Sequence, residues 1–187
     1  MKLGAVILAA GAGRRLGGVA KALMKRGDET FLACIVKTAR AVGLTDAVVV
    51  VGPPFAEEVA SAARDLGARI VVNEAPERGM SSSVALGFGA VMTSDVEAAW
   101  LWPVDHPNVG ARALERLVAA LPGHVVAKPR FVGRHGHPPL VARSSFAALA
   151  ACSDEPGGAR AVLARHANET VIVDVDDEGV TEDVDEA

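Results

Sequence analysis

The sequence contains no tyrosine, and aromatic residues make up only 4% of its 187 positions. Half of the residues are apolar, with alanine and valine dominant, so the core must be built from small aliphatic side chains. Such cores suit parallel strands that helices cover on both faces. The composition therefore favours an α/β protein of one ordinary domain.

Cysteine, positive charge and long apolar segments are also scarce. Cys34 and Cys152 form no C-x-x-C pair and have no histidine at ligand spacing, which favours two buried free thiols in a reducing cytosol. The formal net charge of −4 argues against a general nucleic-acid binder, and no apolar segment is long enough to span a membrane. We therefore expect a cytoplasmic protein with neither a nucleic-acid nor a membrane partner.

Strand-like and helix-like segments alternate along the chain. Apolar runs predict buried strands at 3–10 and 46–54, and further strands are expected at 68–73, 97–107, 124–130 and 169–177. Amphipathic segments predict helices at 29–44, 55–67, 79–92 (with a serine as its cap), 110–123, 144–151 and 157–166, and a turn between two short strands at 131–142. This alternation predicts a mostly parallel sheet in a single domain over residues 1–187, with the first five strands in the order 3-2-1-4-5 if the sheet is doubly wound.

A loop rich in glycine and cations, LAAGAGRRLGGVAK (8–21), follows the first strand. Gly11 and Gly13 allow close backbone approach, and exposed backbone N–H groups favour an anion. The loop is one residue longer than the dinucleotide motif G-x-G-x-x-G, no acid ends the second strand, and Lys21 lacks the flanking residues of a P-loop. A nucleoside triphosphate loop with Arg14 and Lys21 on the phosphates is favoured, and a solvated basic turn is the alternative.

Two further segments place polar groups beside that loop. Asp105 ends the fourth strand, where a carboxylate suits Mg²⁺, and capping of the next helix is the alternative. Asn73 ends the third strand, and Ser81 and Ser82 lie at the start of a helix, where they could contact a base edge or a ribose. Plain helix capping is the alternative for the serines.

The segment GRHGHPPL (133–140) carries two histidines but no further ligands at the spacing of a zinc site. Because Lys128, Arg130 and Arg134 lie close in the sequence, an anionic acceptor substrate is favoured for this segment. A simple surface turn is the alternative.

Four motifs together resemble the molybdenum cofactor nucleotidyltransferases, the MobA/MocA-like family. In the family's order they are LAAGAGRRLGG…K (8–21), NEAPERGMSSS…G (73–87), WPVDHP (102–107) and GRHGHPPL (133–140). GMSSS with GHP, and Ala10 where the guanylyltransferases usually have glycine, resemble the cytidylyltransferase branch. The resemblance implies a three-layer α/β/α, Rossmann-like (GT-A-like) nucleotidyltransferase fold. It also implies transfer of CMP from CTP to a molybdopterin-type phosphorylated acceptor, with release of pyrophosphate.

The resemblance further implies which residues bind the nucleotide and hold its triphosphate. They are Leu8, Ala9, Ala10, Gly11, Gly13, Arg14, Lys21, Asn73, Ser81 and Ser82.

The remaining implied roles concern the metal and the acceptor. Mg²⁺ is expected on Asp105 and on a second carboxylate from the D-x-D near the end of the chain, which is Asp185, with Asp183 as the other candidate. His137 and Arg134 are expected on the acceptor side. Lys21, Asp105 and Arg14 are the expected catalytic residues, and a molybdoenzyme or its chaperone is a further expected partner.

Rival functions share the same sheet. One is a nucleotidyltransferase that uses another nucleotide and a sugar phosphate or other small acceptor, although Ala20 stands where the sugar-phosphate enzymes carry proline. The others are an oxidoreductase, which the missing acid after the second strand disfavours, and a carrier that binds nucleotide without catalysis.

Overall fold

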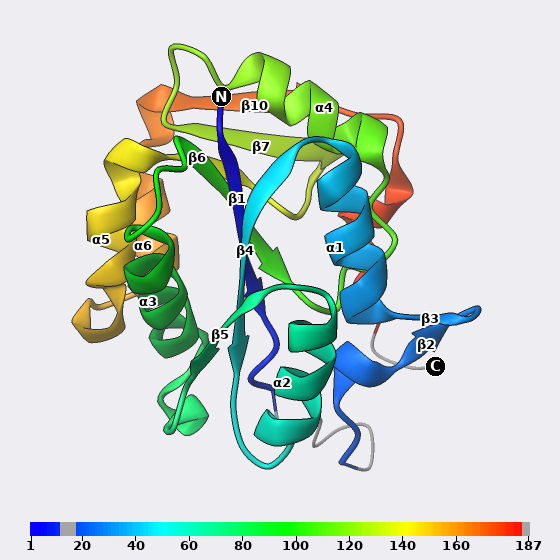
Figure 1. Cartoon of the computed structure of the whole chain (residues 1–187). Coiled ribbons are helices and arrows are strands. Elements are labelled where there is room, and N and C mark those ends of the chain that lie inside the picture. Colours follow the sequence, from blue (N-terminus) through cyan, green and yellow to red (C-terminus); the bar gives the residue numbers. More distant parts are fainter. Residues whose placement is uncertain (12–17, 185–187) are drawn as a thin grey trace.

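A computed structural model describes residues 1–11 and 18–184 of the chain (Figure 1). The strands are β1 (Leu3–Leu8), β2 (Lys25–Arg26), β3 (Glu29–Thr30), β4 (Leu44–Val51), β5 (Arg69–Val72), β6 (Ala98–Pro103), β7 (Val126–Phe131), β8 (Arg134–His135), β9 (Leu140–Ala142) and β10 (Thr170–Asp174). The α-helices are α1 (Phe31–Ala41), α2 (Ala56–Asp65), α3 (Met80–Val91), α4 (Ala111–Ala120), α5 (Phe146–Ala150) and α6 (Gly158–Arg165). No helix of the described residues is long and apolar enough to cross a membrane.

The main sheet has the order β10-β7-β9-β6-β1-β4-β5, with β8 added to β7. β1 pairs in parallel with β4 and β6, β4 with β5, and β7 with β10. The expected order 3-2-1-4 is therefore confirmed for the first four strands. The position expected for the fifth strand, β7, was wrong, because β9 lies between β6 and β7 and runs antiparallel to both.

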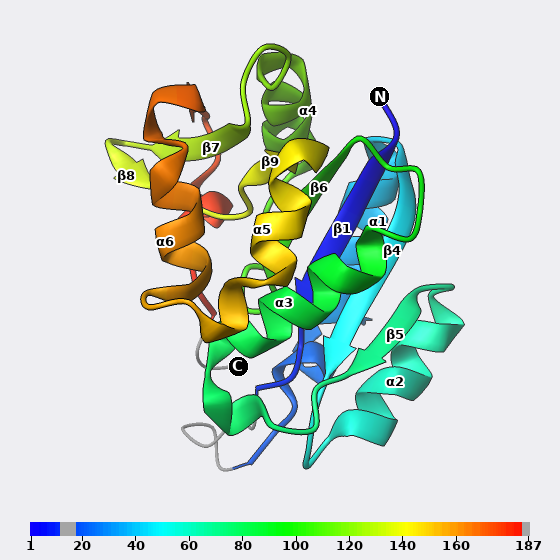
Figure 2. The same ribbon diagram turned by 90° about the vertical axis from the view of Figure 1, so that its left-hand side faces the viewer.

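Both faces of the central strand are buried, which explains its continuous apolar sequence. Ala5 and Ile7 point into a core shared with α1, α2 and α4, whereas Val6 and Leu8 point into a core shared with α3, α5 and α6. The two sets of helices lie on opposite sides of the sheet (Figures 1 and 2). This arrangement confirms the predicted three-layer α/β/α fold with a mostly parallel sheet.

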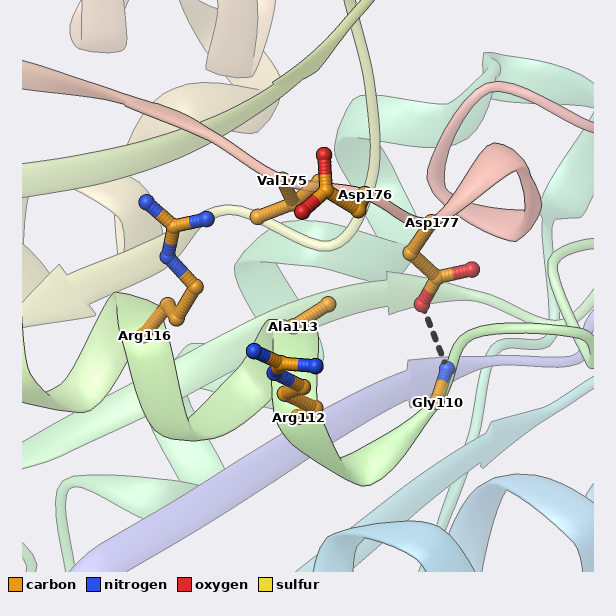
Figure 3. Close-up of a pocket in the computed structure, with 7 residues that line it drawn as sticks. All are labelled: Gly110, Arg112, Ala113, Arg116, Val175, Asp176 and Asp177. Atoms are coloured by element: carbon orange, nitrogen blue, oxygen red, sulfur yellow. Dashed lines mark hydrogen bonds between the residues drawn. The ribbon is translucent and has the colours of Figure 1, made fainter.

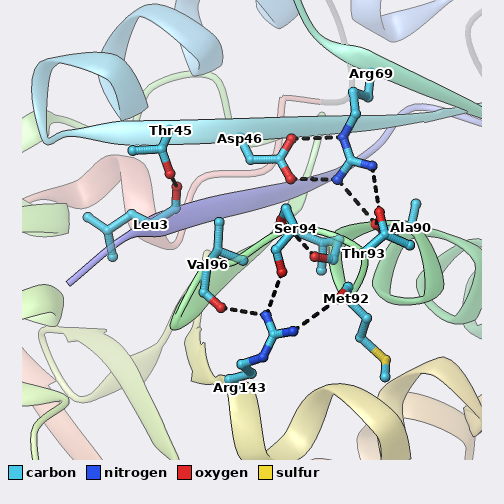
Figure 4. Close-up of polar contacts among 11 residues, drawn as sticks. Leu3, Thr45, Asp46, Arg69, Ala90, Met92, Thr93, Ser94, Val96 and Arg143 are labelled. Atoms are coloured by element: carbon cyan, nitrogen blue, oxygen red, sulfur yellow. Dashed lines mark hydrogen bonds and ion pairs between the residues drawn. The ribbon is translucent and has the colours of Figure 1, made fainter.

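Two arginines tie together the elements at the start of the parallel strands (Figure 4). Arg69 of β5 forms a bidentate ion pair with Asp46 of β4, with an Nε–Oδ1 distance of 2.9 Å, and also donates to Ala90 O at the end of α3. Arg143 donates to the carbonyls of Met92, Ser94 and Val96 at 2.8–3.0 Å. The guanidinium groups thus bind carbonyls of the last turn of α3 and of the segment that joins α3 to β6.

Two local expectations were wrong. The helix expected at 29–44 begins only at Phe31, because Glu29 and Thr30 pair with β2 and Thr30 Oγ1 accepts the N–H of Ala33 as the helix cap. Helix α3 has Gly79, not a serine, at its N-cap position, with no side-chain cap.

Helix α3 packs directly against the central strands at Gly87. A Cβ at this position would lie 2.2 Å from Val6 Cγ1 of β1 and 3.0 Å from Val50 Cγ2 of β4. Gly89, one face away on the same helix, has no atom within 4 Å of such a Cβ. The sheet therefore restricts one of these glycines and not the other.

We expect Gly87→Ala to destabilise the fold by about 1–3 kcal/mol, because overpacking a closed interface forces the helix away from the sheet. Gly89→Ala should be neutral or stabilising by up to about 1 kcal/mol, because alanine is the better helix former. Thermal and denaturant unfolding of both variants measures the difference, and equal stability of the two would contradict the packing described.

Candidate functional site

The loop that follows β1 starts at the carboxyl edge of the sheet. Leu8, Ala9 and Ala10 are buried, at 8%, 8% and 4% exposed. Ala10 lies close to the end of β4, since a Cβ on Gly52 would be 3.0 Å from Ala10 Cβ. Gly11 is exposed, and a Cβ at its position would have no atom within 4 Å. The other loop residues predicted for the phosphates, Gly13 and Arg14, lie outside the described residues.

Asp105 and Lys21, two of the three residues expected to be catalytic, lie beside each other. β6 pairs with β1 up to Pro103 opposite Leu8, so the chain leaves both strands at the same edge. Lys21 begins the short 3₁₀ helix η2 (Lys21–Leu23), and its Nζ is 3.5 Å from Asp105 Oδ2. Both side chains are partly buried, 21% and 31% exposed, which strengthens their attraction relative to bulk water.

Asp105 does not cap the helix that follows it. The N–H of Gly110, at the start of α4, donates instead to Asp177 Oδ2 at 2.8 Å (Figure 3). Asp105 Oδ1 is buried and has no hydrogen-bond partner among the described residues, and His106 Nε2 is 3.9 Å away. The carboxylate is therefore held at the strand end with one oxygen unsatisfied.

A cavity of about 300 Å³ opens beside Asp105. Its lining comes from the start of α3, the end of β6, the chain around β8 and the end of the chain: Met80, Pro103, Asp105, His106, His135, Gly136, His137, Val180, Thr181 and Asp183. Two carboxylates and no lysine or arginine stand among these lining residues. The wall is therefore acidic.

This donor set fits a hard divalent cation better than a closed transition-metal site. Asp105 offers an unsatisfied carboxylate oxygen, and Asp183 lines the same cavity. Within residues 1–11 and 18–184, no group of three or more His, Cys, Asp or Glu side chains is arranged to hold a metal ion. Mg²⁺ needs few protein ligands, because it keeps several waters and shares phosphates with the substrate. Asp185 lies outside the described residues.

A segment near the end of the chain, residues 177–184, crosses the site, and we call it the C-terminal strap. Val180 O accepts the N–H of His137 at 2.6 Å, and the N–H of Val184 donates to Asp105 O at 2.8 Å. Asn108 Nδ2 donates to Glu182 Oε2 at 2.7 Å. The strap thus joins the end of β6 to the chain after β8.

His137 is packed against His106, a residue that the sequence reasoning did not single out. The ring centroids are 4.9 Å apart, with 37° between the planes. Burial, then the nearby His106, lowers the pKa of His137 to about 4, with Asp105 opposing and Lys128 adding to the shift. His137 is therefore neutral at pH 7. Arg134 is exposed on β8 and does not line the cavity, whereas His135 does.

The serines after β5 take up different positions. Asn73 Nδ2 donates to Ser82 Oγ at 2.8 Å and to Ser83 Oγ at 2.9 Å, and all three side chains are buried. Ser82 Oγ in turn donates to Gly79 O. Ser81 instead turns toward α6 and accepts the N–H of Ala159 at 3.2 Å. Asn73 and Ser82 are thus brought together, and Ser81 points to a neighbouring helix.

A second cavity, of about 240 Å³, lies between α4 and the chain that leaves β10 (Figure 3). None of the residues expected at the nucleotide or acceptor site lines it. Its lining residues are Gly110, Arg112, Ala113, Arg116, Val175, Asp176 and Asp177.

Polar residues at the carboxyl edge between β1 and β6 of this mostly parallel α/β/α sheet are typical of nucleotide-binding α/β proteins. Residues 5–171 match the MobA-like NTP transferase domain, and the chain belongs to this family. It is 33% identical to nicotine blue oxidoreductase of Paenarthrobacter nicotinovorans over 96% of this chain and 90% of that protein.

Solved structures agree with this assignment. The crystal structure of Rv0371c from Mycobacterium tuberculosis H37Rv aligns with a TM-score of 0.76 and 27% identity, over 99% of this chain and 93% of that one. A complex of Rv0371c with manganese aligns with a TM-score of 0.69 and 24% identity, over 94% of this chain and 90% of that one, which shows the shared fold. The expected family and nucleotidyltransferase fold are thus confirmed, and the roles of individual residues remain predictions.

Because His137 is neutral in the folded protein, we expect the free energy of unfolding to decrease as the pH decreases. The unfolded chain takes up a proton on this residue near pH 6.5, but the folded chain only near pH 4, so stability is lost as the pH falls between these values. From pH 7 to 5 the loss attributable to His137 is on the order of 2 kcal/mol. His137→Gln should reduce the pH dependence of denaturant unfolding, and the exposed control His124→Gln should not. An equal pH dependence in both variants would contradict the burial of His137.

The strap can cross the site only because residue 136 has no side chain. A Cβ on Gly136 would lie 2.2 Å from Val180 O and 2.9 Å from Val180 Cβ. We expect Gly136→Ala to cost about 1–3 kcal/mol and to expose the amides of His137 and Val184 to hydrogen exchange. Gly89→Ala is the control. Unchanged protection of both amides in Gly136→Ala would show that the strap is not held at this contact.

Proposed function

We propose that the protein transfers CMP from CTP to the phosphate of a molybdopterin-type acceptor and releases pyrophosphate. The observation that carries this proposal is the contact between Lys21 and Asp105 at the edge where β1 and β6 end. It supports a triphosphate site, because a cation and a metal-binding carboxylate stand together beside a glycine-rich loop. The family supports a nucleoside triphosphate and a small acceptor as substrates.

In the proposed reaction an oxygen of the acceptor phosphate attacks the α-phosphorus of CTP. The bond from that phosphorus to the bridging oxygen of the β-phosphate breaks, and pyrophosphate leaves with the electron pair. Lys21, with Arg14, holds the triphosphate and neutralises the charge that grows on the leaving group. Asn73 and Ser82 hold the segment after β5 beside the nucleoside through their mutual hydrogen bond.

The proposed metal ion is Mg²⁺ on Asp105, with Asp183 or Asp185 as a second ligand. When bound, it would neutralise phosphate charge and act as a Lewis acid at the transferred phosphoryl group. The unsatisfied Oδ1 of Asp105 and the acidic wall of the cavity support this assignment. The manganese complex of Rv0371c adds support from a protein of the same fold.

The choice of CTP is supported by Ala10, which stands where the guanylyltransferases usually carry glycine. Its side chain is 4% exposed and lies close to the backbone that follows β4. We propose that the methyl group narrows the base pocket at this point. The product would then pass to a molybdoenzyme or its chaperone in the cytoplasm.

We expect pyrophosphate release with CTP and a pterin phosphate acceptor, and less with GTP, UTP or ATP. Lys21→Met and Asp105→Asn should each lower kcat/KM by at least ~10²-fold, as removal of one preorganised charge does elsewhere. The exposed control Asp65→Asn, at the end of α2, should not change the rate. Normal turnover by Asp105→Asn would contradict the assignment of Asp105 as a metal ligand. Preference for another nucleotide would contradict the assignment of CTP as the donor.

A second candidate is an oxidoreductase, which the name of the relative nicotine blue oxidoreductase favours. No acid follows β4, where the chain reads Val51-Gly52-Pro53-Pro54, so the usual ribose contact of a nicotinamide cofactor is not supplied there. Oxidation of NADH or NADPH in the presence of nicotine blue, without any pyrophosphate release from CTP, would favour this candidate.

A further inference from the structure

The second cavity, between α4 and the chain that leaves β10, combines a buried apolar floor with charged walls (Figure 3). The side chains of Ala113 and Val175 line it and are almost fully buried. Its volume of about 240 Å³ lies below the roughly 300–1,000 Å³ of pockets for drug-sized ligands. A concave site of this size suits a molecule of a few carbon atoms better than the surface of a partner protein.

The cationic wall consists of Arg112 and Arg116, which lie one turn apart on α4 and extend from it beside the cavity (Figure 3). Within residues 1–11 and 18–184, neither guanidinium forms an ion pair or a hydrogen bond. Asp174 is already in a bidentate pair with Arg130, at 2.6 and 2.8 Å. Like charges at this helical spacing repel each other and destabilise the helix. An anion bound between the two arginines would remove this repulsion.

The opposite wall carries two aspartates with different roles. Asp177 is a structural residue, because its Oδ2 accepts the N–H of Gly110 at 2.8 Å and its Oδ1 accepts the N–H of Gly179 at 3.0 Å. Asp176 is exposed and has no partner in the part of the chain that the structure describes. The cavity therefore offers two guanidinium groups to an anion and one carboxylate to a hydroxyl donor.

The number of arginines indicates which anionic group fits. The two oxygens of a carboxylate match the fork of a single guanidinium, so a carboxylate would leave the second arginine without a partner. A phosphate monoester has three terminal oxygens and a charge of about −1.5 to −2 at pH 7. It can therefore accept hydrogen bonds from both arginines and balance both of their charges.

We propose that this cavity is a second binding site, which takes a small phosphate monoester on Arg112 and Arg116 while Asp176 accepts a hydrogen bond from a hydroxyl group of the ligand. The proposal does not depend on the proposed function, since none of the residues expected at the nucleotide or acceptor site lines this cavity.

A ligand in this site would also hold the start of the strap. It would bridge α4 to Asp176, which directly precedes the strap, beside the contact that Asp177 makes with Gly110. A ligand that binds only when these segments are together raises the free energy of their local separation. We therefore expect a bound phosphate monoester to slow hydrogen exchange of the Gly179 amide, which donates to Asp177.

The test measures binding of glycerol 3-phosphate to the full chain by calorimetry, at about 0.15 M salt so that weak surface attraction is screened. Arg112→Gln and Arg116→Gln should each weaken binding about tenfold or more, because a hydrogen bond between charged groups is lost. Both side chains are exposed, so the fold should tolerate these changes. The matched control Arg160→Gln removes an exposed arginine of α6 that lines neither cavity, and it should bind as the wild type does.

Ethyl phosphate, which has the same phosphate but no hydroxyl group, tests the role of Asp176. Asp176→Ala should weaken binding of glycerol 3-phosphate but not of ethyl phosphate, because only the first ligand can donate to the carboxylate. Equal weakening of both ligands would contradict this part of the proposal.

Three results would overturn the site itself. One is no binding of glycerol 3-phosphate by the wild type at millimolar concentration. Another is binding that Lys21→Met abolishes and the arginine variants leave intact, which would place the phosphate at the nucleotide loop. The third is unchanged exchange of the Gly179 amide at saturating ligand, which would show that the ligand does not hold the strap. Absence of pyrophosphate release from CTP, by contrast, would reject only the proposed function.

Discussion

The parallel pairing of β1 with β4 on one side and β6 on the other is the constraint on which the rest of the structure depends. It aligns Leu8 with Val50 and with Pro103, so three chain segments leave the sheet at one edge. The loop with Lys21, the turn with Asp105 and the segment at Gly52 are therefore neighbours, although they lie far apart in the sequence. Close packing of α3 at Gly87 and the arginine contacts at the opposite end hold this alignment. The chemistry of the site follows from the register of one strand.

Sequence patterns predicted the elements whose burial is uniform. β1, β4 and β6 are apolar on both faces, and this pattern needs no knowledge of distant partners. The fifth predicted strand, β7, was wrongly expected beside β6, because the three residues of β9 carry no sign that they pair with both β6 and β7. The order of a mixed sheet depends on long-range contacts, which local periodicity does not encode.

The same distinction applies to the candidate site. Asp105 was predicted to face the glycine-rich loop that ends at Lys21, because the ends of neighbouring strands at a switch point lie side by side. His106 was missed although it follows Asp105 directly, because its packing against His137 depends on the turn after β8. The contact of Ser81 with α6 could not be predicted either, since nothing near residue 81 indicates a partner 78 positions later in the chain. Side chains that bind distant backbone groups carry no local pattern.

The strap has a consequence for how the end of the chain tolerates change. Val175 N donates to Arg130 O at 2.9 Å, and Val184 N donates to Asp105 O at 2.8 Å, so the residues between them are anchored at both ends. Residues 175–184 therefore behave as a closed loop, whose length and turn geometry are fixed by both anchors, and they should tolerate insertions and deletions less well than a free terminus does. Deleting or inserting a residue there would shift Thr181 and Asp183 along the cavity rim, whereas the same change in an exposed surface turn would leave the cavity unaltered.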